Sequence, residues 1–243
     1  MPGKINKKGK EESSPITATQ FVKGMNSLAK SGADNSRYFR GDASATKFLN
    51  VRMGDVFALA KKFTSMPVEE IEKLFDSDYY EVRLGAVCIM DFLARNKKIT
   101  PEQRKSLFEL YIDNHHRIDN WDMIDRSAPY VVGGYLADKP RAILYKLAKS
   151  KNVWERRTAI VSTYYFIRQN EIDDTFKIAE LLVRDKEDMV SKAVGSWVRE
   201  AGKRDRERLL SFLDKYAGTM ARDTLRYATE KLDKKTKDFY LKR

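Results

Sequence analysis

The feature that most constrains the fold of this chain is a helical run that recurs along it. Each run puts a polar residue ahead of apolar residues spaced by three and four, the period of an amphipathic helix. The runs are VRMGDVFALAKKF, EVRLGAVCIMDFL, MIDRSAPYVVGGYL, ERRTAIVSTYYFI, VSKAVGSWVRE and ARDTLRYATEKL. The polar residues taken as equivalent are Arg52, Arg83, Asp125, Arg157, Lys192 and Asp223. Their separations of 31, 42, 32, 35 and 31 residues match paired-helix repeats such as HEAT and armadillo units.

No segment sustains the strict alternation of a β-strand, and Pro67, Pro140 and Gly218 fall between the helical runs. We therefore predict an all-α fold, an α-solenoid of HEAT-like repeats whose second helices line a basic concave groove. Residues 16–243 are expected to form a single domain. Residues 1–15, MPGKINKKGKEESSP, contain almost no apolar side chain and are expected to form a flexible basic tail.

The charge balance indicates a class of partner. Lys and Arg number 47 against 35 Asp and Glu, a formal net charge of +12. This excess favours a polyanion, most simply nucleic acid, although a membrane surface or solubility alone would also account for it. A single cysteine, Cys88, excludes a disulfide within the chain, and no apolar run is long enough to span a bilayer. We expect a soluble, cytoplasmic protein.

Metal, cofactor and nucleotide chemistry are not indicated. His115 and His116 are adjacent, without the spacing or the nearby cysteines of a zinc site. Neither a phosphate-binding G-x-x-x-x-G-K-[ST] loop nor a G-x-S-x-G elbow occurs. We therefore expect the protein to need no metal and no cofactor.

The repeat predicts that the equivalent polar residues stack along one side of the solenoid. Cationic side chains spaced by the repeat would follow a phosphate backbone. Asp125 interrupts them, and an acid there opposes DNA binding unless something positive sits beside it. Trp121 precedes Asp125 by four residues, so on a helix the indole and the carboxylate share one face. We predict that this face is the chemical centre of a DNA-binding protein.

Each of these residues also has a structural explanation. Arg83 and Arg157 could pair with nearby surface acids. Asp125 could cap a helix or form a salt bridge in the neighbourhood of Arg126, and Trp121 could belong to the core. Tyr38, in the segment RYFR, could contact nucleic acid or anchor a polar loop. The combination of acid, indole and cationic neighbours favours the functional interpretation.

The segment NWDMIDRSAPYVVG resembles the NWDLVD-type signature of AlkD-like DNA alkylation repair proteins, the HEAT-repeat DNA glycosylases of bacteria. Three further segments support the resemblance and occur in the family's order: FLNVRMGDVFALAK near the start, VWERRTAIVST in the middle and KAVGSWVREAGK toward the end. The resemblance therefore covers residues 38–232. It implies a DNA glycosylase of the bacterial cytosol and nucleoid. Its substrates would be cationic N3- or N7-alkylated purines, chiefly 3-methyladenine and 7-methylguanine, removed from double-stranded DNA without flipping the lesion into a pocket.

The resemblance also implies roles for single residues. Asp125 matches the family's catalytic aspartate, and Trp121 matches the aromatic that contacts the deoxyribose. Arg157 matches an arginine that holds the DNA backbone near the lesion, and Tyr38 matches a further cleft aromatic. The remaining expected DNA-binding residues are Trp197, Arg83, Lys192 and Trp154.

The sequence departs from the family at one position. The family usually reads AIGW, whereas this chain reads AVGSW, which puts Ser196 at the motif position and Trp197 one residue later. One residue turns a helical side chain by about 100°. Either Trp197 reaches the cleft through a local shift, or the cleft has a single tryptophan wall. The rival interpretations are a non-catalytic HEAT-repeat binder of branched or damaged DNA and a protein-interaction scaffold. A monomer is expected for this architecture.

Overall fold

The computed structural model describes residues 16–29 and 34–243, so the predicted tail at residues 1–15 lies outside the described residues. The described chain is helical and has no β-strand, only an isolated bridge between Lys47 and Tyr79. No helix in this part of the chain is long and apolar enough to cross a membrane. The prediction of an all-helical repeat fold is confirmed.

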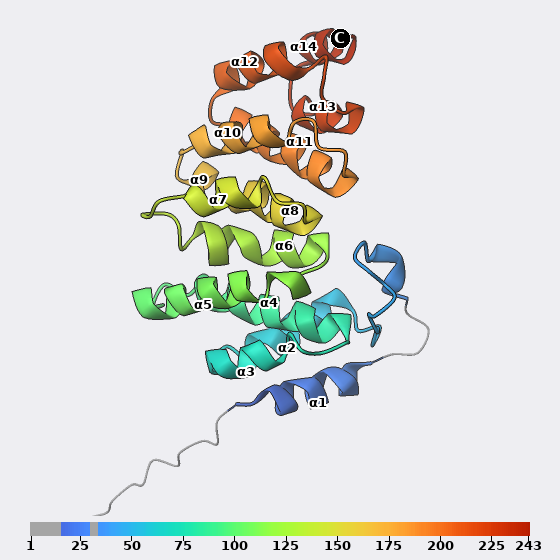
Figure 1. Ribbon diagram of the computed structural model, residues 1–243, viewed down its shortest axis with the longest axis vertical. Coiled ribbons are helices and arrows are strands. Elements are labelled where there is room, and N and C mark those ends of the chain that lie inside the picture. The colour runs from blue at the N-terminus through green and yellow to red at the C-terminus, as the bar shows by residue number, and fades with distance from the viewer. Residues whose placement is uncertain (1–15, 30–33) are drawn as a thin grey trace, which may run out of the picture.

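The helices form two rows (Figure 1), and in the first row each helix contacts the next. The first row comprises α2 (Met53–Lys62), α4 (Tyr80–Ala94), α6 (Trp121–Ala128), α8 (Val153–Ser162), α11 (Asp188–Gly202) and α13 (Arg222–Ala228). The second row comprises α1 (Ala18–Leu28), α3 (Val68–Lys73), α5 (Pro101–Asp113), α7 (Ala142–Leu147), α10 (Asp173–Leu182), α12 (Arg206–Tyr216) and α14 (Lys234–Leu241). Short helical turns complete the chain: η1 (Ser36–Tyr38), η2 (His115–Arg117), the π-helical η3 (Pro129–Gly133) and α9 (Tyr164–Arg168).

Helix starts follow local sequence chemistry. Thr17 caps α1, because its hydroxyl accepts from the Gln20 N–H at 3.3 Å and the Gln20 side chain accepts from the Thr17 N–H at 2.9 Å. Thr100 and Gln103 form the same reciprocal box at α5. Such boxes satisfy backbone donors that the first turn of a helix leaves free.

A glycine sets the spacing of the first row near its C-terminal end. An added Cβ at Gly195 would lie 2.5 Å from the carbonyl oxygen of Thr224, a separation that real Cβ atoms do not show. The absence of a side chain therefore lets α11 approach α13 closely. The core runs without a break from Phe21 in α1 to Tyr240 in α14. This continuous packing holds the first-row helices in the register that the functional residues need.

A buried histidine makes the stability of this fold sensitive to pH. His115 is 4% exposed, its Nε2 lies 2.9 Å from the Thr158 hydroxyl, and its Nδ1 has no partner among the described groups. Burial lowers the pKa of His115 from 6.5 to about 4. His115 therefore binds a proton near pH 6.5 in the unfolded chain but only near pH 4 in the folded chain. The stabilisation is complete above pH 6.5 and declines as the pH falls through this window.

As the pH falls from 7.5 to 5, we expect protonation of His115 in the unfolded chain to lower the free energy of unfolding by about 2 kcal/mol. Urea denaturation at several pH values measures the slope. His115→Gln should flatten it, because glutamine does not titrate. His116→Gln changes an exposed neighbour and should keep the wild-type slope. Equal slopes in wild type and His115→Gln would contradict the assignment.

Candidate active site

A cavity of 420 Å³ lies against four successive first-row helices, α6, α8, α11 and α13. We call it the acid cavity. It is lined by five of the residues predicted from sequence: Trp121, Asp125, Arg157, Lys192 and Trp197. These residues come from positions up to 76 apart in the chain, so the stacking of the repeats is what brings them together.

The register of the first-row helices explains why these residues lie together at the acid cavity. Asp125, Arg157 and Lys192 are each the fifth residue of their helix, in α6, α8 and α11. Because these three helices contact one another in order, equivalent positions come to lie on the same side. The predicted row of polar residues therefore exists over this part of the fold.

Asp125 already has a cationic partner. The Arg157 guanidinium donates from Nε to one carboxylate oxygen at 3.0 Å and from Nη2 to the other at 2.7 Å. Its Nη1 donates to the Met189 carbonyl oxygen. The side chains of Arg157 and Asp125 are 8% and 32% exposed. Burial raises the pKa of the Asp125 carboxyl, and Arg157 opposes that rise. Asp125 thus forms a salt bridge inside the cavity, with Arg157 and not near Arg126, which pairs with Asp91.

The shifted tryptophan reaches the cavity. Trp197 and Ser196 both line it, and α11 continues as a helix through them. The Trp197 ring stacks on Tyr164 with centroids 5.2 Å apart and planes 19° from parallel. Trp197 thus lies at the acid cavity on an uninterrupted helix, without a local shift in α11. Trp121 and Trp197 therefore wall the same cavity as Asp125.

Tyr38 lies beside Trp121, outside the acid cavity. The indole Nε1 of Trp121 donates to the Tyr38 carbonyl oxygen at 3.3 Å, and the Tyr38 ring is 53% exposed. The next part of this segment is fixed to α6 as well, because the Arg40 N–H donates to the Asn120 side chain at 2.9 Å. The RYFR segment is thereby held against the N-terminal end of α6.

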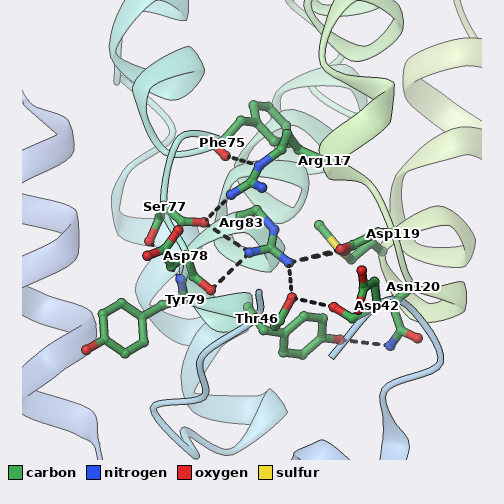
Figure 2. A network of polar contacts seen from close by, with 12 residues as sticks. Asp42, Thr46, Phe75, Ser77, Asp78, Tyr79, Arg83, Arg117, Asp119 and Asn120 are labelled. Atoms are coloured by element: carbon green, nitrogen blue, oxygen red, sulfur yellow. Dashed lines mark hydrogen bonds and ion pairs between the residues drawn. The ribbon is translucent and has the colours of Figure 1, made fainter. Parts of the chain in front are cut away.

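Arg83 does not line the acid cavity. Its guanidinium instead bonds to the turn at Ser77 and Asp78 and to Asp119 (Figure 2). It is 1% exposed, and its Nη1 donates to the carbonyl oxygens of Ser77 and Asp78 at 3.0 and 3.1 Å. Its Nη2 lies 3.2 Å from the Asp119 carboxylate. A guanidinium buried among protein acceptors has no surface for a phosphate, so the structure places Arg83 as a link between turns and not at a DNA-facing position.

Trp154 is also separate from the acid cavity. It is 7% exposed and belongs to the continuous hydrophobic core. An indole buries a large apolar area, which makes the core its usual place. The Trp154 ring is therefore too buried to contact DNA.

Lys192 has acidic neighbours of its own. Its Nζ lies 2.6 Å from Asp188 and 3.9 Å from Asp223. It also lines an adjoining cavity of 660 Å³, where Arg222, Arg226 and Lys237 add three further cations. Lys192 therefore stands between the acid cavity and the C-terminal end of the first row.

Besides Met189, Ala193 and Ser196, three charged or aromatic residues of the acid cavity were not among the expected site residues: Arg40, Arg199 and Tyr227. Arg40 carried a signal, since it belongs to the basic and aromatic RYFR segment. Arg199 is bound by Glu200 at 3.3 Å and by Glu230, and nothing in its local sequence distinguishes it from a surface arginine. The described residues contain no group of three or more His, Cys, Asp or Glu side chains that could hold a metal.

The sequence model of the family described as DNA alkylation repair enzyme matches residues 25–232. A predicted DNA alkylation repair enzyme from Enterococcus faecalis has a similar structure, with a TM-score of 0.60 and 16% identity over 78% of this chain and 90% of that one. AlkD2 from Streptococcus mutans is similar with a TM-score of 0.54 and 18% identity, over 89% of this chain and 100% of that one. At these identities the structural likeness shows the fold alone. No curated protein matches the sequence.

Proposed function

Because the chain belongs to the DNA alkylation repair enzyme family, we propose that it is a DNA glycosylase acting on double-stranded DNA. Its substrates are cationic N3- and N7-alkylated purines, with 3-methyladenine and 7-methylguanine as the principal ones. The observation that supports this proposal best is the meeting of the Asp125 carboxylate with two indoles, Trp121 and Trp197, in one cavity.

The reaction follows from the charge of the substrate. An N3- or N7-alkylated purine is already positive, so its glycosidic bond is primed to break. As the bond lengthens, its electron pair moves to the base, which leaves neutral, and the sugar becomes an oxocarbenium cation. The Asp125 carboxylate stabilises that cation. It also orients a water whose oxygen bonds to the sugar carbon and whose proton passes to the carboxylate.

Arg157 gives the site a way to respond to DNA. In the free protein its guanidinium neutralises Asp125. A DNA phosphate entering the acid cavity competes for the same guanidinium, because arginine binds phosphate and carboxylate with the same forked geometry. The phosphate thereby leaves more of the Asp125 charge available to the sugar cation.

The tryptophans supply the walls for the sugar. An indole face packs against the deoxyribose and attracts the developing cation, by about 1–2 kcal/mol once water is excluded. Trp121 is held by its hydrogen bond to Tyr38 and Trp197 by its stack on Tyr164. Both walls are therefore positioned before DNA arrives.

Release of 7-methylguanine and 3-methyladenine from methylated duplex DNA tests the proposal, with unmethylated DNA as the control. The expected result is liberation of both bases by the wild-type protein. Tight DNA binding without any base release would instead favour a non-catalytic binder of branched or damaged DNA. The Arg157–Asp125 pair supports that second candidate, because it leaves the carboxylate already neutralised.

Arg157→Ala tests the role of the guanidinium in DNA binding. We expect weaker binding and a slope of log K against log salt that is shallower by about 0.9, the value for one lost phosphate contact. Fluorescence anisotropy over a series of salt concentrations measures both. Arg206→Ala is the matched control, because Arg206 is an exposed arginine that pairs with Asp233 on the surface and does not line the acid cavity. An unchanged slope in Arg157→Ala would place the DNA elsewhere.

A further inference from the structure

A second cavity, of 410 Å³, adjoins the acid cavity, because Asp125 and Trp197 line both. We call it the arginine cavity. Its other charged residues are Arg95, Arg168 and Glu200. They come from the C-terminal parts of their helices, because Arg95 follows α4, Arg168 ends α9 and Glu200 lies in the last turn of α11. Asp125 and Trp197 therefore stand between two cavities that both contain arginines.

Both acids of the arginine cavity already have cationic partners. Asp125 is bound by Arg157, and burial raises the pKa of its carboxyl. Glu200 accepts from the Lys203 Nζ at 2.8 Å on each of its carboxylate oxygens, and the Arg199 Nε lies 3.3 Å from one of them. Neither acid therefore needs a further cation from a ligand.

Arg168 is a cation of this cavity without such a partner. It is an exposed residue at the end of α9. Its guanidinium forms no hydrogen bond or ion pair with the rest of the chain that the structure describes. Guanidinium stays charged at every pH at which proteins fold, and its N–H groups match the oxygens of a phosphate. Arg168 therefore offers a complete set of donors to an anion in the cavity.

Arg95 is held in place with part of its guanidinium unused. Its Nε donates to both carboxylate oxygens of Asp91 at 2.8 Å, and its Cζ lies 3.7 Å from the centroid of the Tyr130 ring. Arg126 also binds the buried Asp91 carboxylate, at 3.0 Å. Two arginines thus share one acid, which leaves one positive charge in excess. Burial raises the pKa of Asp91, and protonation would only increase this excess.

Two tyrosines complete the set of donors. Tyr130 and Tyr164 line the arginine cavity, and their hydroxyl groups make no hydrogen bond to the described part of the chain. DNA phosphates accept hydrogen bonds from arginine and tyrosine side chains alike. The groups left unused around this cavity are therefore cations and hydroxyls, which is the composition of an anion site.

We propose that the arginine cavity binds a DNA phosphate directly beside the lesion. This inference rests on the proposed glycosylase function, which places the sugar of the lesion at Asp125. A deoxyribose in DNA lies between its 5′ and 3′ phosphates. Because Asp125 lies between the two cavities, one of these phosphates reaches Arg157 and the other reaches Arg168 and Arg95.

Holding the two phosphates fixes the sugar between them. The reacting carbon is then positioned against the Asp125 carboxylate and the Trp197 ring, which both cavities share. Only the DNA backbone enters the protein, so the base stays in the duplex. This agrees with the expectation, drawn from the family resemblance, that the lesion is not flipped into a pocket. Arg168 acts in positioning the substrate, whereas Asp125 acts on the sugar.

Binding of DNA that cannot react tests the inference. The duplex contains one tetrahydrofuran residue, a stable analogue of a nucleotide without its base. In two further duplexes, the phosphate on the 5′ or the 3′ side of this residue is replaced by an uncharged methylphosphonate. Fluorescence anisotropy measures the affinity for each. We expect the wild-type protein to lose about tenfold in affinity at either replacement.

Arg168→Ala and Arg157→Ala should each become insensitive to a different phosphate. Arg168→Ala should bind the unmodified duplex about tenfold more weakly and lose nothing further when the phosphate of the arginine cavity is neutral. It should keep the wild-type response to the other replacement, and Arg157→Ala should show the reverse pattern. Because Arg168 is exposed and unpaired within the described chain, its truncation should leave the fold intact.

Arg206→Ala is the control, since Arg206 is an exposed arginine that lines neither cavity, and it should respond to both replacements as wild type does. Wild-type responses of Arg168→Ala to both replacements would overturn the inference, as would a wild-type protein indifferent to both.

The base-release assay separates this result from the proposed function. The crossed pattern of the two variants without base release would support the phosphate site and remove the glycosylase. Base release together with wild-type DNA binding by Arg168→Ala would retain the glycosylase and remove the role of the arginine cavity.

Discussion

Asp125→Asn is expected to reduce base release from methylated DNA by on the order of 100-fold or more, a typical effect of removing one preorganised group that stabilises transition-state charge. Asparagine keeps the size of the side chain and removes its charge. The same change frees the Arg157 guanidinium, which donates to both carboxylate oxygens in the wild type. DNA affinity should therefore be retained or increased, while the oxocarbenium cation loses its counter-charge.

The matched control is Asp113→Asn, which removes an exposed acid at the end of α5. It should leave both base release and DNA affinity at wild-type values. Single-turnover kinetics with DNA fully bound separate the chemical step from binding. Wild-type rates of base release from Asp125→Asn would end the assignment of Asp125 as the catalytic carboxylate.

Arg83→Ala is expected to lower the free energy of unfolding by about 3 kcal/mol or more, the usual cost of breaking a buried charged network. Arg83 is 1% exposed and joins the carbonyl oxygens of Ser77 and Asp78 to the Asp119 carboxylate. Truncation leaves the Asp119 carboxylate without this counter-charge and opens a space between the turns. The carbonyl oxygens of Ser77 and Asp78 each lose one of two donors, because they also accept from Arg117 and from the Lys47 N–H. Urea denaturation measures the loss.

Lys47→Ala is the control for this region, because Lys47 pairs with the same Asp78 residue on the surface. Exposed pairs contribute little, so its stability should stay near that of wild type. The DNA-binding salt slope should be unchanged in Arg83→Ala under conditions where it is folded. A stable Arg83→Ala protein with a reduced slope would restore Arg83 as a phosphate contact.

The row of polar residues could be predicted because stacking repeats convert sequence period into spatial order. Asp125, Arg157 and Lys192 all occupy the fifth position of their helices and meet at the acid cavity. The match weakens at the ends of the row: Arg83 is the fourth residue of α4, and Asp223 is the second residue of α13. Sequence patterns do not fix helix starts to one residue, because capping decides them.

Contacts between distant segments could not be predicted. Arg83 is buried because turns supply its acceptors, and a helical pattern contains no information on turns elsewhere in the chain. Trp197 reaches the acid cavity in contact with Tyr164, which belongs to the separate short helix α9. From the sequence, Trp197 could only be assigned two alternative positions. Likewise, the pairing of Asp125 with Arg157 was not among the alternatives drawn from the sequence, because the two residues lie on separate helices, 32 positions apart.

The first row also has a mechanical consequence. Each of its helices contacts the next, and the acid cavity spans four of them, from α6 to α13. Its width is therefore set by three packing interfaces in series, and small rotations at each interface add up along the stack. Close approaches such as that of Gly195 to Thr224 fix the distance between neighbouring helices. A larger side chain at one such position would therefore change the width of the acid cavity without altering any residue that lines it.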